Sequence, residues 1–139
     1  MTITYTNELT AEEFNALRVS VGWTAIESSL AKKGLENTAF TVCAKDCEKA
    51  VGMARVITDY GYVVYISDVV VLPEYQGKGI GREIMSKVLN YINENIALNQ
   101  RKFVTLMAAN GKEEFYKKFG FDASTTATGM IKWIEKKRE

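Results

Sequence analysis

The sequence contains no histidine, a single proline and only two cysteines. Without histidine, mechanisms that need an imidazole base are excluded, and so are metal sites that need an imidazole ligand. The two cysteines, Cys43 and Cys47, have no second pair that would complete a zinc site, so we expect no metal and no disulfide framework. Cys43 lies in an alternating apolar run and is expected to be a small core residue rather than a reactive thiol.

The sequence also has little net charge and no long apolar run. Its 18 Lys and Arg residues nearly balance 17 Asp and Glu residues, which leaves +1 and no general attraction to nucleic acid or to an anionic membrane. The longest apolar run, near residues 63–72, is interrupted by Ser67 and Asp68 and is too short to span a bilayer. The first residues lack the basic and apolar segments of a secretory signal. We therefore expect a cytoplasmic protein that binds neither nucleic acid nor membrane.

What is present is the composition of one ordinary globular domain. The chain has 139 residues, of which 47% are hydrophobic and 25% charged. The only proline is Pro73, and no linker or repeat interrupts the sequence. We expect a single domain over residues 1–139.

Hydrophobic periodicity and turn signals predict alternating strands and helices. A capping box at Thr10 and Glu13 predicts a helix that ends near Val21. A similar signature at residues 24–27, with a glycine stop at Gly34, predicts a second helix. We expect further helices at 79–95 and 113–119, and strands at 3–5, 39–45, 50–58, 62–72, 102–108, 121–124 and 130–135.

The connections between these elements predict the fold class. Short links between the strands at 39–72 favour antiparallel hairpins, and the helix at 79–95 joins two strands in a right-handed crossover. The strand at 102–108 is mostly apolar, so we expect it to be central. The prediction is an α/β (α+β) fold: a mixed, mostly antiparallel, twisted sheet of six to seven strands with four helices.

The segment at residues 68–82 carries the clearest chemical signal. A strand ends at a proline, and a loop with glycines at 77, 79 and 81 leads into the long helix. Such a loop lets backbone N–H groups converge at a helix N-terminus, and Lys78 and Arg82 add cationic donors, so the segment suits a polyphosphate. The spacing matches neither the dinucleotide-binding fingerprint nor the nucleoside-triphosphate loop.

Two motifs resemble the GNAT superfamily of N-acetyltransferases. The sequence Gln76-Gly-Lys-Gly-Ile-Gly81 is similar to the family's acetyl-CoA pyrophosphate loop, and it follows the apolar strand and proline that the family has there. The sequence Phe115-Tyr-Lys-Lys-Phe-Gly-Phe121 resembles a second family segment. The resemblance covers nearly the whole chain and implies a GNAT-like fold and acetyl-CoA as co-substrate.

The resemblance also implies which residues bind the co-substrate. The backbone of the strand before the loop is expected to pair with the pantetheine arm, and the loop amides are expected to hold the pyrophosphate. Asn110 matches a position that often bonds the pantetheine, although it could equally be a helix N-cap. The expected binding residues are Val69, Val70, Val71, Gln76, Gly77, Lys78, Gly79, Ile80, Gly81, Arg82, Asn110 and Tyr116.

Two residues are candidates for catalysis. Tyr116 matches the family tyrosine that protonates the departing thiolate; the alternative is an aromatic residue that packs beside Phe115 and Phe119. Asp68 is unusual in an apolar strand, because an unpaired carboxylate there costs several kcal/mol. It is either the base for an ammonium substrate, as some family members have an acidic pair here, or a structural partner of Arg55. Ser67 replaces the first acid of that pair.

The acceptor is less well defined than the co-substrate. Trp23, Glu27 and Asp59 are candidates for acceptor binding, but each also fits an ordinary packing, helix-surface or turn role. The predicted activity is transfer of the acetyl group from acetyl-CoA directly to a primary amine of a small molecule or peptide. The alternatives are a CoA-binding sensor without turnover and a toxin-like enzyme that acetylates aminoacyl-tRNA. The resemblance further implies a homodimer.

Overall fold

The computed structural model describes residues 1–135. The chain forms two compact units, Met1–Leu106 and Met107–Glu139. The first unit contains the whole sheet and three of the α-helices, and the second contains one short helix.

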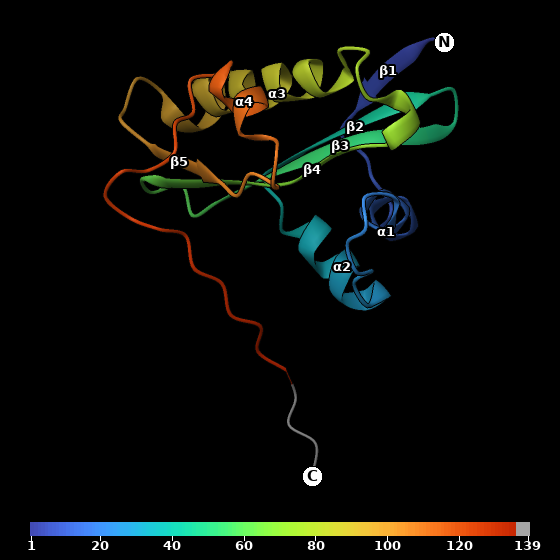
Figure 1. Ribbon diagram of the computed structural model, residues 1–139, viewed down its shortest axis with the longest axis horizontal. Coiled ribbons are helices and arrows are strands. Elements are labelled where there is room, and N and C mark those ends of the chain that lie inside the picture. Colours follow the sequence, from blue (N-terminus) through green and yellow to red (C-terminus); the bar gives the residue numbers. More distant parts are fainter. Residues whose placement is uncertain (136–139) are drawn as a thin grey trace. The chain divides into compact units, whose positions relative to one another are not determined.

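The sheet has five strands in the order β1-β2-β3-β4-β5 (Figure 1). All neighbours are antiparallel except β4 and β5, which are parallel. The long helix between β4 and β5 makes the crossover that a parallel pair requires, as predicted. The strands are β1 (Ile3–Thr6), β2 (Phe40–Asp46), β3 (Lys49–Thr58), β4 (Val63–Val71) and β5 (Phe103–Leu106).

Helices cover both faces of this sheet (Figure 1). Helix α3 (Ile80–Tyr91) lies on one face, and α1 (Ala11–Ser20) and α2 (Ser28–Glu36) lie on the other. Helix α3 continues as a π-helical segment, Ile92–Ala97. Apolar residues recur at every fourth position through α3 and this segment, and all five of them are buried: Ile80, Ile84, Val88, Ile92 and Ile96.

The predicted capping box fixes the beginning of α1. The Glu13 N–H donates to Thr10 Oγ1 at 3.1 Å, and the Thr10 N–H donates to Glu13 Oε1 at 3.0 Å. The second predicted helix differs. It begins at Ser28, with Glu27 as its cap, because Asn15 holds Ile26 outside the helix through bonds of 2.8 Å to its N–H and its carbonyl. It also continues through Gly34 to Glu36.

The number of strands is the main correction to the predicted fold. The prediction of six to seven strands is wrong for the described residues, because 121–135 contain no strand. The Ser124 hydroxyl oxygen accepts the N–H groups of Thr126 and Ala127, and such local bonds compete with strand formation. The strand predicted at 130–135 is an exposed segment, with Met130 91% and Ile134 88% exposed.

The position of β5 within the sheet is a second correction, because its apolar sequence predicted a central strand. It forms an edge of the sheet rather than its centre, because it pairs only with β4 among the described residues.

None of the helices in residues 1–135 is both long and apolar enough to cross a bilayer. In the same residues, no group of three or more His, Cys, Asp or Glu side chains gathers as metal ligands. Cys43 is fully buried in the core, as expected.

Candidate active site

The loop between β4 and α3 has the backbone conformation that alternating glycines permit. After a single turn of 3-10 helix, Pro73–Tyr75, the loop has φ of +78° at Gly77 and +83° at Gly79. Residues with a Cβ adopt this left-handed region only with strain, so the two glycines are required by the backbone. Alternation of left-handed and ordinary residues turns successive N–H groups toward a common concave side, an arrangement that binds anions.

The amides of this loop are free to bind a ligand. Gly79 is the N-cap of α3 and has no side chain to cap it, and the first helical bond runs from the Glu83 N–H to the Gly79 carbonyl. No described residue accepts a hydrogen bond from the N–H groups of residues 77–82. Gln76 differs from the other residues predicted to hold the pyrophosphate, because its N–H already donates to Pro73 O at 3.2 Å. Its side-chain amide donates to Val71 O at 2.9 Å.

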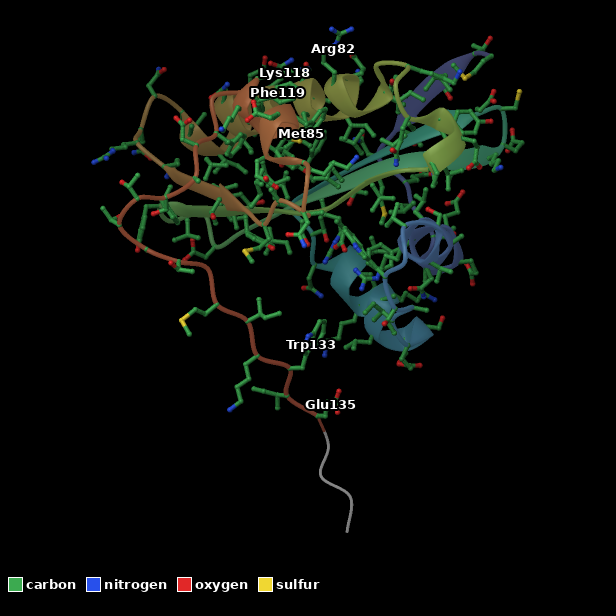
Figure 2. The ribbon with its side chains drawn as sticks, in the orientation of Figure 1. Arg82, Met85, Lys118, Phe119, Trp133 and Glu135 are labelled. Atoms are coloured by element: carbon green, nitrogen blue, oxygen red, sulfur yellow. The ribbon has the colours of Figure 1, made fainter. Side chains whose placement is uncertain are left out.

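Two cations border this loop. Lys78 and Arg82 are both exposed, and the Arg82 Nη2 atom lies 3.5 Å from the position that a Cβ on Gly79 would occupy. Figure 2 shows the Arg82 side chain pointing away from the sheet at the beginning of α3, while Met85, one turn later, is buried against it. The free amides, the positive end of the helix dipole and the two cations together make an arrangement that favours a bound anion.

Strand β4 presents an open backbone edge beside the loop. The last pair between β4 and β5 joins Ile66 and Leu106, so residues 69–71 have no strand partner on that side within the first unit. The Leu72 N–H donates to Val51 O at 2.9 Å on the β3 side. On an extended strand, the N–H of Val71 therefore points the other way, where an extended ligand can pair with it, while the Val71 carbonyl already accepts the Gln76 side-chain amide.

A β-bulge at Asp68 separates the paired and open parts of β4. Ser67 lies opposite Arg55 and Val70 opposite Met53, so two residues of β4 face one residue of β3. Asp68 has φ of +56°, a conformation that aspartate tolerates better than most residues with a Cβ. The bulge turns the Asp68 carboxylate toward the face of the sheet that α1 covers.

The Asp68 carboxylate is held by two arginines. Arg55 Nε donates to Asp68 Oδ2 at 2.8 Å, which is the ion pair that the structural alternative predicted. Arg18 Nη1 donates to Asp68 Oδ1 at 2.8 Å, and this partner, 50 positions away in the chain, was not predicted. The Ser67 hydroxyl donates to Oδ2 at 3.0 Å. Both carboxylate oxygens therefore accept hydrogen bonds, and the base role of Asp68 remains a prediction.

The three residues predicted for acceptor binding have different surroundings. The Trp23 ring stacks against the Arg18 guanidinium at 5.3 Å. The Glu27 carboxylate caps α2, and the hydrogen bonds from Ser29 and Leu30 lower its pKa. Asp59 Oδ1 accepts the Gly61 N–H at 2.8 Å in the turn between β3 and β4. Glu27 and Asp59 thus have local structural roles, whereas Trp23 adjoins the Asp68 cluster through Arg18.

The second unit contains the other two predicted site residues. Tyr116 lies in α4 (Glu113–Lys117), is 8% exposed, and packs edge-on against Phe115 and Phe121. Burial raises the pKa of its phenol. Asn110 does not cap α4, since Lys112 occupies the N-cap position without a side-chain bond, so the N-cap alternative is wrong. The roles of Tyr116 in proton transfer and of Asn110 in pantetheine binding remain predictions.

The model of the acetyltransferase (GNAT) domain family matches residues 5–135. The chain belongs to the GNAT acetyltransferase family. A relative in Pyropia yezoensis, named uncharacterized N-acetyltransferase ycf52, is 32% identical over 113 residues, or 78% of this chain. GCN5-related N-acetyltransferase 2, chloroplastic, of Arabidopsis thaliana is 34% identical over 64% of this chain.

The chain spans 63% and 33% of the lengths of these two relatives. A crystal structure of a probable acetyltransferase from meticillin-resistant Staphylococcus aureus matches more completely. It is 35% identical, with a TM-score of 0.86 over 96% of this chain and 99% of that one. A GNAT family protein of Streptococcus pneumoniae is 28% identical, with a TM-score of 0.76 over 98% of both chains. The GNAT resemblance predicted from the two motifs is confirmed.

Proposed function

We propose that this GNAT protein transfers the acetyl group of acetyl-CoA to a primary amine. The observation that carries the proposal is the row of free N–H groups at residues 77–82, at the beginning of α3. Relatives named N-acetyltransferases support it. So does a structure from Clostridium acetobutylicum described as a predicted acetyltransferase with acetyl-CoA, which shares the fold at 16% identity and a TM-score of 0.71.

The co-substrate would bind along the open edge of β4 and across the loop. Its diphosphate accepts hydrogen bonds from the amides of residues 77–82, with Lys78 and Arg82 neutralising its charge. Its pantetheine arm pairs with the backbone of Val69–Val71, and Asn110 adds a side-chain amide. Binding both reactants in one line supplies much of the rate enhancement.

The transfer would proceed in a ternary complex without an acetyl-enzyme. The neutral amine attacks the thioester carbonyl carbon, the carbonyl oxygen gains negative charge, and a strand N–H near Val70 stabilises it. The C–S bond then breaks, and the thiolate takes a proton from Tyr116. A cysteine nucleophile has no support in the fold. Burial raises the pKa of Cys43 to about 11, and Cys47 lies on the surface in the turn between β2 and β3.

The proton that the amine loses would leave through water rather than directly to Asp68. Arg18, Arg55 and Ser67 already donate to both oxygens of that carboxylate, and a direct transfer would break one of these bonds. Tyr116 suits the other proton transfer, in which the departing thiolate gains a proton. Its pKa lies above the ordinary 10.0 because of burial, so the phenol carries its proton at neutral pH.

A panel of amines tests the proposal. Free-thiol release from acetyl-CoA is measured with small amines, amino sugars, polyamines and a peptide N-terminus, for the protein and for Tyr116→Phe. We expect release with at least one amine. In Tyr116→Phe, kcat should fall about 100-fold with little change in the KM for acetyl-CoA, since one proton donor is removed. Tyr62→Phe, at a tyrosine that is 69% exposed, is the matched control.

Two outcomes of this panel would count against the proposal. Coenzyme A binding without thiol release from any amine would favour the non-catalytic sensor. Undiminished turnover in Tyr116→Phe would mean that another group protonates the thiolate.

Acetylation of aminoacyl-tRNA is disfavoured by a net charge of +1, because contacts to the phosphates supply most of the affinity for a nucleic acid. A cytoplasmic location and a homodimer remain predictions.

A further inference from the structure

The cluster formed by Arg18, Asp68 and Arg55 carries more positive charge than its own contacts neutralise. All three side chains are largely buried, at 14%, 7% and 15% exposure respectively. Two guanidinium groups share one carboxylate, and no other carboxylate among residues 1–135 forms an ion pair with either arginine. A surplus of largely buried positive charge is costly unless something else compensates it.

The remaining donors of the two arginines are only partly used. Arg18 Nε donates to Thr24 O at 3.0 Å. Arg55 Nη1 donates to Gly34 O at 3.3 Å and to Thr38 Oγ1 at 2.9 Å. Neither Nη2 atom has a partner in the described part of the chain. Since that part also contains no sealed side-chain nitrogen or oxygen without a partner, both Nη2 atoms reach solvent.

The two guanidinium groups are held rigidly in place. Their central carbons lie 5.7 Å and 5.5 Å from the centre of the Phe14 ring, and Arg18 also stacks on Trp23 at 5.3 Å. The bonds to Asp68 and to the backbone fix their orientation further. Guanidinium groups fixed in this way lose little conformational entropy when they bind a planar carboxylate or a phosphate.

The cluster also lies next to the proposed point of reaction. Asp68 directly precedes Val69–Val71, the open edge of β4 assigned above to the pantetheine arm. Trp23 and Thr24 connect the cluster to the loop between α1 and α2. An acceptor that approaches the thioester from this side therefore meets a positive site, which favours a negative group and disfavours a second ammonium.

We propose that the acceptor amine carries an anionic group, a carboxylate or a phosphate, that the free Nη2 groups of Arg18 and Arg55 bind. Asp68 holds the two arginines in place and offsets one of their charges. This inference rests on the proposed function and narrows its acceptor from amines in general to amino acids, amino-sugar phosphates and similar compounds.

Matched pairs of amines test the inference. Thiol release is measured with phenethylamine against phenylalanine for the carboxylate, and with glucosamine against glucosamine 6-phosphate for the phosphate. We expect kcat/KM to be at least about 10-fold higher for the anionic member in one of the two pairs, since charge-assisted bonds are the stronger kind. In Arg18→Gln and Arg55→Gln the ratio within that pair should fall toward 1, and Arg18→Lys should retain part of it.

The controls separate recognition from folding. The KM for acetyl-CoA and the thermal unfolding temperature are measured for each variant, and Arg101→Gln, at an exposed arginine, is the matched control. Equal or better use, in both pairs, of the amine that lacks the carboxylate or phosphate would overturn the inference and leave the transferase intact. The inference would also be overturned if the kcat/KM ratio within a pair stayed unchanged in both Arg18→Gln and Arg55→Gln. No thiol release from any amine would instead overturn the proposed function, and the inference with it.

Discussion

At the scale of single residues, Asp68 connects the fold to the chemistry. It occupies a left-handed position in a β-bulge, and it is bound on both sides by arginines from α1 and β3. The bulge separates the part of β4 that pairs with β5 from the part whose edge is open. This arrangement favours a role in holding the strand and the arginines over a role as the base.

Asp68→Asn distinguishes these two roles. Asparagine accepts the same backbone conformation, but the substitution removes the only carboxylate in residues 1–135 that pairs with these two largely buried guanidinium groups. We expect the free energy of unfolding to fall by about 3 kcal/mol, whereas Asp59→Asn in an exposed turn should change it by less than about 0.5 kcal/mol. Assayed well below its unfolding temperature, Asp68→Asn should lose less than about 10-fold in kcat, below the usual contribution of a general base, and keep the shape of its pH profile. A kcat loss of about 100-fold or more, with one limb of that profile gone, would identify Asp68 as the base.

Single residues were predictable where the signal was local. The Thr10 and Glu13 capping box depends on neighbours in the sequence and is as predicted. The loop before the long helix was also predicted from its glycines, whereas the left-handed φ of Gly77 and Gly79 is a finding of the structure. The pair between Asp68 and Arg55 was predictable because adjacent strands bring them together. Arg18 was not, because its position depends on how α1 packs on the sheet, which no local pattern encodes.

At the scale of elements, the loop and α3 act together as one binding device. The glycines turn the N–H groups of the loop, and α3 contributes its own free amides and the positive end of its dipole. Helix α3 is in turn anchored by its buried apolar stripe. The loop is therefore presented on a rigid support.

Gly79→Ala tests this device. A Cβ at φ of +83° costs about 1–2 kcal/mol and would lie 3.5 Å from Arg82 Nη2, so we expect the Kd for coenzyme A to rise about 10-fold. Gly22→Ala is the matched control, because its φ is +87° with nothing within 4 Å, and it lies outside the loop. Fluorescence or calorimetric titration measures both. Equal Kd values for the two variants would mean that the loop geometry does not determine binding.

The type of each element, helix or strand, was predicted more often than its first and last residues. The four α-helices and the strands β1–β5 correspond to predicted segments, since each has a clear period or turn signal. The beginning of α2 was misplaced because a side chain from α1, Asn15, holds Ile26 outside the helix. The predictions of strands at 121–124 and 130–135 were wrong, because an alternation of apolar and polar residues forms a strand only where a neighbouring strand pairs with it.

At the scale of the whole molecule, we expect this chain to bind coenzyme A through its diphosphate. The family, the five-stranded mixed sheet and the loop all agree with it. The near-neutral net charge means that the affinity must come from this local site rather than from a general field. The single domain predicted for residues 1–139 remains a prediction beside the two compact units.

Calorimetric titration with coenzyme A, and with pantetheine as the matched ligand that lacks the diphosphate, tests this claim most directly. We expect one coenzyme A site per chain and a Kd at least about 100-fold higher for pantetheine, because pantetheine lacks the several charge-assisted hydrogen bonds of the diphosphate. Raising the ionic strength should weaken coenzyme A binding and leave pantetheine binding nearly unchanged. No heat with coenzyme A, or equal affinity for the two ligands, would contradict the account.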